Sequence, residues 1–345
     1  MQLVSRRSEA FNWVIGGYYF SSVDRLHPFS LKLSAPYFTP PGIQDLFQID
    51  IRDRLSSRSL AAFAQGTLAL APGTNITGGI RYTDETRRLF GQEFGFADGF
   101  PVGEVIPAVR SSISAKQVTY RAAIDHKFAQ DVMGYLSFNT GFKSGGFNGF
   151  DPTNPPYQPE KLTAYEAGLK TELLDRRLRL NLAAFYYDYT NIQVTRYITT
   201  ALVYNGASAR LYGGDLDIAW RATPELQITG GLELLSSKFL SFPNAQFSIP
   251  LPNGGIAPVS GDAAGNRLPY AAKVSASVSI DYSKQLASGV LDLNLTNAFN
   301  SGYPSEPDNR LRVGSFDLLS ASIAYTPTGG RWNLRLYAKN LLNEV

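Results

Sequence analysis

The sequence predicts an all-β fold, a transmembrane antiparallel β-barrel, from three observations: alternation of apolar and polar residues, alternation of short and long connections, and aromatic residues near strand ends. In residues 117–128, the apolar row includes Val118, Tyr120 and Ile124, and the positions between them are mostly polar. A period of two places successive side chains on opposite faces of a β-strand. One face therefore meets water and the other meets a dry medium.

The same period predicts about fourteen strands along the chain. The alternation is clearest in residues 273–283, where Val274, Ala276 and Val278 alternate with serines and charged residues, and it recurs in residues 74–85. The predicted strands are residues 2–6, 11–21, 57–71, 74–90, 114–128, 131–144, 161–173, 177–197, 204–221, 226–239, 271–284, 289–299, 315–326 and 331–342.

The connections between these strands alternate between short and long. Tight turns are predicted at Pro72–Gly73, Ala129–Gln130, Leu174–Arg176, Thr223–Pro224, Gln285–Ala287 and Pro327–Gly330. Each tight turn is followed by a longer loop, so all the long loops lie at one end of the sheet. This asymmetry, on antiparallel strands of about ten or more residues with one apolar row, is typical of outer-membrane β-barrels.

Composition supports a barrel over helical membrane spans. Hydrophobic residues make up 44% of the 345 residues, but no apolar run approaches the roughly 20 residues that a transmembrane helix needs. Aromatic residues make up 12%, and many, such as Tyr82, Phe128 and Trp332, lie near predicted strand ends, where girdle residues meet lipid headgroups. Strands favour aromatic residues in any setting, which is the alternative explanation of this enrichment.

Several function classes are excluded by what the sequence lacks. It has no cysteine, hence no disulfide or thiolate nucleophile, and we expect no metal site and no cofactor. The net charge of +3 comes without a basic run, so we expect no nucleic-acid partner. His27 and His126 are the only histidines, and His126 falls on the apolar row near a short turn. We therefore predict no catalytic residue and no enzyme activity.

The two ends of the sequence differ from those of a complete exported protein. Met1–Arg7 contains no apolar stretch followed by a cleavage site, so no signal peptide is expected there. The last predicted strand ends at Asn340–Val345 without a partner, although a membrane barrel cannot expose an unpaired edge to lipid. We interpret residues 1–345 as a barrel domain truncated at both ends, and we expect no transport by this piece alone.

Five segments, in order, resemble motifs of TonB-dependent outer-membrane receptors. Gly79–Glu85 (GIRYTDE) is similar to the family's G-x-R-Y-T-D strand, and Ser137–Asn148 (SFNTGFKSGGFN) resembles its S-x-G-F-K-x-G-G-F-N segment. Pro159–Lys170 (PEKLTAYEAGLK) resembles P-E-x-x-x-x-Y-E-x-G-x-K, and Leu178–Tyr189 resembles the strand that follows it. Asn340–Asn343 (NLLN) resembles the box near the family's C-terminus. The subfamily resembled is the siderophore receptor of Gram-negative bacteria.

The resemblance implies a barrel of about 22 strands, of which this chain holds about 14, filled by an N-terminal plug domain that is absent here. It implies four partners: outer-membrane lipid, the protein's own plug, the TonB complex acting through that plug, and a ferric siderophore. Cobalamin or an oligosaccharide is the alternative ligand, and a soluble all-β adhesion or lectin module is a third function class. Polar residues such as Asn181, Asn294 and Arg335 count against that third class, because a sandwich would pack its second sheet there.

The period of two also assigns each strand residue to a face. The residues expected to point outward to lipid include Ile80, Ile124, Leu180, Ile228, Val278 and Leu334. The residues expected to point into the lumen include Arg81, Arg121, Asn181, Glu233, Ser277 and Arg335. These assignments follow from a lumen that is wet or lined by the plug.

Ligand-binding residues are expected in the long loops. Residues 91–113 and 145–160 are both predicted as loops with aromatic surfaces able to hold an aromatic siderophore. The candidate ligand-binding residues are Phe94, Phe96, Phe100, Arg110, Phe147, Phe150 and Tyr157. Arginines such as Arg81, Arg110 and Arg121 suit an anionic iron chelate. The alternative is that the loop aromatics pack on each other and that the arginines pair with plug carboxylates. Loops 22–56 and 240–270 are predicted to act as lids.

Overall fold

The structure, a computed structural model, describes residues 1–6, 8, 10–33, 47–97, 100–197 and 201–344, and every regular element in them is a β-strand. The large sheet consists of β1 (Gln2–Val4), β2 (Phe11–Leu33), β3 (Phe47–Ala71), β4 (Thr74–Ala97), β5 (Phe100–Ala129), β6 (Val132–Lys143), β7 (Glu160–Leu173), β8 (Leu178–Tyr197), β9 (Ala201–Arg221), β10 (Leu226–Ser241), β13 (Val274–Leu286), β14 (Gly289–Asn300), β17 (Phe316–Pro327) and β18 (Leu334–Ala338). The predicted all-β fold with one continuous fourteen-stranded sheet is confirmed.

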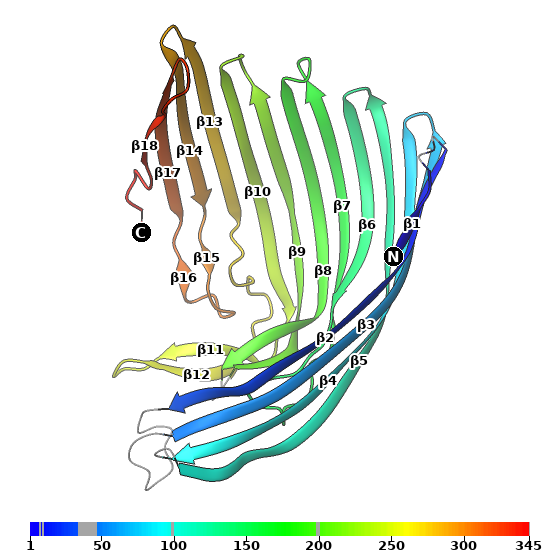
Figure 1. The fold of residues 1–345 in the computed structure, drawn as a ribbon, viewed down its shortest axis with the longest axis vertical. Helices are drawn as coiled ribbons and strands as arrows, with labels where there is room; N and C mark the ends of the chain where they lie inside the picture. Colours follow the sequence, from blue (N-terminus) through cyan, green and yellow to red (C-terminus); the bar gives the residue numbers. More distant parts are fainter. Residues whose placement is uncertain (7, 9, 34–46, 98–99, 198–200, 345) are drawn as a thin grey trace.

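The sheet is curved like part of a barrel wall, and its two edges do not meet (Figure 1). Its strands pair in chain order, and in the described part of the chain no ladder joins the edge strands β1 and β18. The short turns gather at the upper end of the view and the long connections at the lower end, as the sequence predicts (Figure 1). In the two-residue turn between β3 and β4, Gly73 has a φ of 76°, a left-handed conformation that suits a residue without a Cβ. Among the described residues, no helix is long and apolar enough to cross a membrane.

The register separates the two predicted sets of side chains, because directly opposed residues share a face of the sheet. One face, here called the apolar face, carries Ile80, Ile124, Leu180, Ile228, Val278 and Leu334. The other, here called the polar face, carries Arg81, Arg121, Asn181, Glu233, Ser277 and Arg335. That the apolar face meets lipid and the polar face meets the lumen stays a prediction.

Strands β4 and β5 extend far beyond their predicted ends, so the prediction of a loop at residues 91–113 is wrong. The two strands have 24 and 30 residues and are separated only by residues 98–99. The residues expected in that loop, Phe94, Phe96, Phe100 and Arg110, lie on strands instead. Three register shifts accommodate the pairing of β4 with β5 in this segment, and β4 is also paired with β3 as far as Ala97.

The predicted lid loop at residues 22–56 is also largely strand. β2 continues to Leu33 and β3 begins at Phe47, with one register shift between Leu26 and Phe29. The middle of that predicted loop, residues 34–46, lies outside the described residues.

The other predicted lid, residues 240–270, contains a hairpin of β11 (Ala245–Pro250) and β12 (Ile256–Gly261). A smaller hairpin, β15 (Tyr303–Pro304) with β16 (Arg312–Val313), lies between β14 and β17. Side chains of the first hairpin region pack on the polar face of β9 and β10. The buried cluster there consists of Ala207, Ala209, Phe239, Phe242, Ala245 and Ala263.

Candidate functional site

Residues 144–159, here called the inner loop, connect β6 to β7 and are held against β8 and β9. The Asn148 side chain forms two hydrogen bonds with the backbone of Val203: Nδ2 donates to the carbonyl at 3.0 Å, and Oδ1 accepts from the amide at 2.7 Å. Gln193 Nε2 donates to the carbonyl of Ser144 at 2.9 Å. These bonds attach the inner loop to strands that come later in the chain.

The same loop packs on the other side against β4 and β2. Gly91 lies on the polar face of β4, and a Cβ added there would lie 2.8 Å from Cβ of Pro152. Phe150 contacts Phe29 edge to face, with ring centroids 5.9 Å apart. Because β4 and β9 are five positions apart in the sheet, a loop that touches both crosses the hollow of the curled sheet. This packing supports the prediction that the polar face is the inner one.

Two buried carboxylates lie on the polar face next to the inner loop. Asp53 on β3 and Glu93 on β4 are 8% and 4% exposed, and among the described residues neither Oδ1 of Asp53 nor Oε1 of Glu93 has a hydrogen-bond partner. At about 3.3 Å per residue and a tilt of about 45°, their positions roughly 20 residues from the short turn lie beyond an apolar band about 25 Å tall. Both groups are therefore outside the membrane-spanning part.

Burial changes the proton affinity of both carboxylates. It raises the pKa of Asp53 to about 6, since the charged form loses its hydration. Burial, together with the negative charges of Asp151 on the inner loop and of Asp53, raises the pKa of Glu93 to about 7. The contact between the inner loop and the sheet therefore contains groups that titrate near neutral pH.

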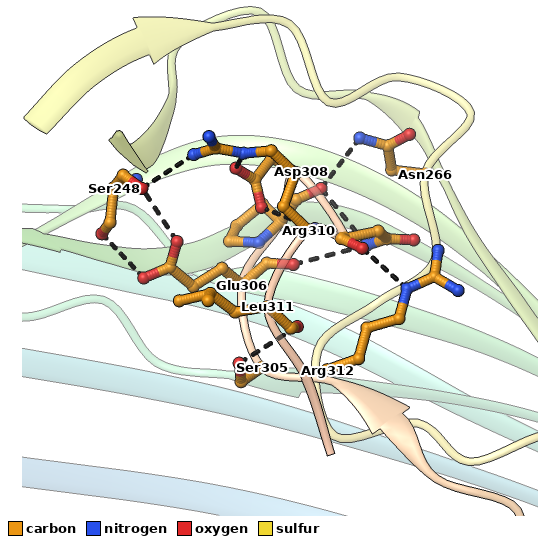
Figure 2. A network of polar contacts seen from close by, with 10 residues as sticks. Ser248, Asn266, Ser305, Glu306, Asp308, Arg310, Leu311 and Arg312 are labelled. Atoms are coloured by element: carbon orange, nitrogen blue, oxygen red, sulfur yellow. Dashed lines mark hydrogen bonds and ion pairs between the residues drawn. The ribbon is translucent and has the colours of Figure 1, made fainter. Parts of the chain in front are cut away.

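A second polar network joins the loops that follow β10 and β14 (Figure 2). Glu306 accepts hydrogen bonds from Oγ of Ser248 at 2.7 Å and from its amide at 3.3 Å. The Asn309 side chain bonds both backbone groups of Arg267, at 2.9 and 2.8 Å. Arg310 donates to the carbonyl of Ser248 at 2.7 Å. The two loops therefore form one connected unit at the long-loop end of the sheet.

Three of the candidate ligand residues lie together on the inner loop. Phe147 is half-buried, and Phe150 is 42% exposed. Tyr157 forms two backbone hydrogen bonds with Gly146, at 3.0 and 2.9 Å, which close the base of the loop. The sequence-based prediction of a loop at residues 145–160 is confirmed, and its aromatic side chains lie at the long-loop end.

The other three aromatic candidates are not brought to the inner loop. Phe94 lies on β4 with the Arg52 guanidinium carbon 4.7 Å from its ring centroid. Phe96 lies opposite Gln48 on β3, and Phe100 begins β5 with 75% of its surface exposed. These residues form the far end of the long strands.

The three arginines expected to meet an anionic chelate are divided between the two faces. Arg110 lies on the apolar face, 4.9 Å from the ring centroid of Phe90. Arg81 and Arg121 lie on the polar face, and Arg121 Nη1 donates to Oδ1 of Asn139 at 3.4 Å. Arg110 therefore lies on the face opposite to Arg81 and Arg121, and contact of any of the three with a chelate stays a prediction.

Among the described residues, His126 has no carboxylate partner that would orient it as a catalytic base. His126 lies on the apolar face, with Nδ1 2.7 Å from Oγ1 of Thr74 and its ring edge-on to Phe128 at 4.8 Å. Within the described residues, no group of three or more His, Cys, Asp or Glu side chains is placed to hold a metal ion.

The residues that fasten the inner loop were not identified from the sequence. Asn148 on the loop bonds to Val203 of β9, and Gln193 on β8 and Asn205 on β9 bond to the loop backbone. Asn205 Nδ2 donates to the carbonyl of Gln158 at 2.8 Å. Their only signal is that amide side chains stand near the ends of long strands, which is common in any loop. Their partners lie 47 to 55 residues away in the sequence.

A curled antiparallel sheet with an apolar face and with long loops packed on its polar face defines the wall of an outer-membrane receptor barrel. The family model "TonB dependent receptor-like, beta-barrel" matches residues 5–341, and the chain belongs to this family. The family and its structural neighbours are outer-membrane proteins of Gram-negative bacteria. They are receptors, not enzymes, so the predictions of the family and of no enzyme activity are confirmed.

The comparisons with individual proteins agree. The chain is 23% identical over 295 residues to the pesticin receptor of Yersinia pestis, covering 84% of this chain and 40% of that protein. It superposes on the ferric yersiniabactin uptake receptor FyuA from Yersinia pestis with a TM-score of 0.75 at 20% identity, covering 99% of this chain and 48% of that one. The siderophore receptor PiuA from Acinetobacter baumannii gives a TM-score of 0.74 at 18% identity, covering 99% and 51%. At these identities the superpositions show the fold alone.

Proposed function

We propose that this chain forms the barrel wall of an outer-membrane receptor that imports a ferric siderophore under control of the TonB complex. The observation that carries the proposal is the similarity, along 99% of the chain, to proteins named as a ferric yersiniabactin uptake receptor and a siderophore receptor. The chain spans about half of those structures and 40% of the pesticin receptor, so the activity of the whole protein is part of the proposal. Its partners are outer-membrane lipid, an N-terminal plug, TonB acting through that plug, and the chelate.

The inner loop is the proposed ligand contact. Phe147, Phe150 and Tyr157 offer aromatic surface at the long-loop end. Arg81 and Arg121 lie nearer the short turns on the polar face, and they supply positive charge along the route below the loop. An aromatic, anionic iron chelate matches both features. The polar face lines the lumen in this proposal, so Asn181, Glu233 and Arg335 line the route below the loop.

The test is uptake of radioactive iron by a Gram-negative strain that lacks its own siderophore receptors and expresses the intact protein containing this chain. We expect TonB-dependent uptake of ferric yersiniabactin or of a ferric catecholate. Uptake of cobalamin or an oligosaccharide, with no ferric chelate bound, would overturn the ligand class. Phe150→Ala should lower chelate affinity roughly tenfold. Phe128→Ala, which removes an aromatic at the short-turn end, is the matched control and should leave affinity unchanged.

A further inference from the structure

The apolar face of β2 to β5 changes character toward the long-loop end, where it carries a cluster of arginines. Direct Cα pairing places Arg25, Arg54, Phe90 and Arg110 in one row across the four strands. The next two rows on this face toward the short turns contain Arg88 and then Arg58. The cluster, here called the outer arginine cluster, consists of Arg25, Arg54, Arg58, Arg88 and Arg110, and all five are exposed.

The positive charge of this cluster is not neutralised within the described residues. None of the five arginines forms an ion pair there, and Arg110 only covers the Phe90 ring. Two nearby carboxylates on the same face have other partners: Asp84 lies 4.0 Å from Lys116, and Asp50 accepts hydrogen bonds from two neighbouring side chains. A third, Glu104, is exposed and lies opposite Phe94, two rows beyond Arg110 toward the far end of the strands.

Arg25 and Arg54 oppose each other directly, and such a like-charge pair lowers the stability of a sheet. A sheet face that holds opposed arginines without acidic partners has a composition that suits an external anion.

The depth of the cluster indicates which anion. On the same face, the row after Arg58 contains Tyr19 and Leu60 beside the ion pair of Asp84 with Lys116. The row after that contains Tyr82 and Val118, and these four large apolar side chains are 40 to 63% exposed. Exposed tyrosines mark the boundary between hydrocarbon and headgroups in membrane barrels. The arginines therefore begin where the polar headgroups of the leaflet on the long-loop side begin.

We propose that the outer arginine cluster binds the phosphate groups of a phosphorylated lipid headgroup whose acyl chains lie along the adjacent apolar band. Guanidinium groups bind phosphate through paired, charge-assisted hydrogen bonds, and several of them match a headgroup that carries more than one phosphate. The inference rests on the membrane location in the proposed function, but it is independent of the imported ligand. A lipid fixed to this face would hold the long strands β2 to β5 at a defined depth.

The test compares lipid binding by the intact protein and a triple variant, purified in a non-ionic detergent. The probe is diphosphorylated lipid A, with the same lipid stripped of its phosphates, and inorganic phosphate alone, as separate arms. Arg54→Gln, Arg58→Gln and Arg88→Gln together should weaken binding of the phosphorylated lipid about 100-fold, since each cation near an anionic lipid surface contributes about fivefold. The dephosphorylated lipid should bind the intact protein and the variant equally.

The matched control removes three exposed arginines near the short turns, Arg179, Arg221 and Arg331, with the same change of charge and no expected loss. Equal weakening by both triple variants would overturn the proposal, because net charge alone would explain the binding. Equal binding of both lipid forms would show that the apolar band acts alone, and inorganic phosphate binding as tightly as the lipid would exclude a lipid site. If the arginine variant still binds the ferric chelate, it is folded. If neither the intact protein nor the variant binds the chelate, only the proposed function is contradicted, because the lipid measurement does not depend on the chelate.

Discussion

The two faces of the long strands β2 to β5 carry opposite charges in the region beyond the membrane band. The apolar face there carries the exposed outer arginine cluster, and the polar face carries the buried carboxylates Asp53 and Glu93. Alternate residues of the same strands thus meet different surroundings. The inner loop covers the carboxylates, while nothing among the described residues covers the arginines.

The difference shows that the period of two continues along the whole length of the long strands. Nearer the short turns, alternation separates the apolar face, which we expect to meet lipid, from the polar face, which we expect to meet the lumen. Beyond the bilayer, the same alternation separates a face that packs against the protein's own loop from a face left open to other molecules. Substitutions on neighbouring residues of one strand should therefore have different consequences, and three experiments test this.

The largest effect is expected for Gly91→Leu on the inner side. A side chain there would overlap Pro152 and Oδ1 of Asp53, which a Cβ would already approach to 2.8 and 2.7 Å. We expect undocking of the inner loop at a cost of about 1–3 kcal/mol. Hydrogen exchange at the amides of Tyr157 and Val203, which bond to Gly146 and Asn148, measures this cost.

Gln92→Leu changes the adjacent residue, whose side chain points to the opposite face, and is the control for this experiment. It should leave exchange at Tyr157 and Val203 unchanged, because the inner loop does not pack on that face. If both variants accelerate exchange equally, the two faces do not differ in the way described here.

A smaller effect is expected from pH. The pKa of Glu93 is raised to about 7 and that of Asp53 to about 6, so the docked state binds protons more tightly than the unfolded chain. Their contribution to docking is fully present below the ordinary pKa near 4.5 and is lost as the pH rises through 7. Loop protection, corrected for intrinsic exchange, should therefore fall between about pH 5 and pH 8.

Glu93→Gln should remove most of this pH dependence, because an amide does not titrate. Glu85→Gln is the matched control on the same strand and face, since Glu85 is bonded to Arg87 at 2.7 Å. A profile that keeps its full pH dependence in Glu93→Gln would show that Glu93 is not the titrating group and would leave Asp53 as the candidate.

The smallest effect is expected on the outer side. In lipid-free detergent, Arg54→Gln should stabilise the protein by about 0.2–1 kcal/mol, because it removes a like-charge pair with Arg25. Arg25→Gln should have the same effect, and the double variant should gain less than the sum. Thermal unfolding of the four proteins gives this cycle. Destabilisation by either single variant would mean that the two arginines have partners in the folded protein.

Local sequence determined much of the fold and part of the candidate site. Alternation placed Ile80 and Val278 on one face and Arg81 and Ser277 on the other, because the side-chain period of a strand is the same wherever it occurs. The glycine-rich segment after β6 was identified as a loop, and with it the aromatic residues of the inner loop. Turn residues and alternation act over a few positions, so they can be recognised without any knowledge of distant contacts.

Only the tertiary structure decided what lies beyond these local patterns. Residues 91–97 and 100–113 contain glycines and prolines that are typical of a loop, yet pairing of β4 with β3 and of β5 with β4 makes them strand. Asn148 forms a hydrogen bond with Val203, which lies 55 residues further along the chain. Asp53 and Glu93 lie close enough beneath the inner loop for their charges to interact, although they are on different strands. Such contacts depend on how the sheet curls and on which strands it brings opposite each other. The energy of each contact is set by burial and distance, which no local stretch of sequence contains.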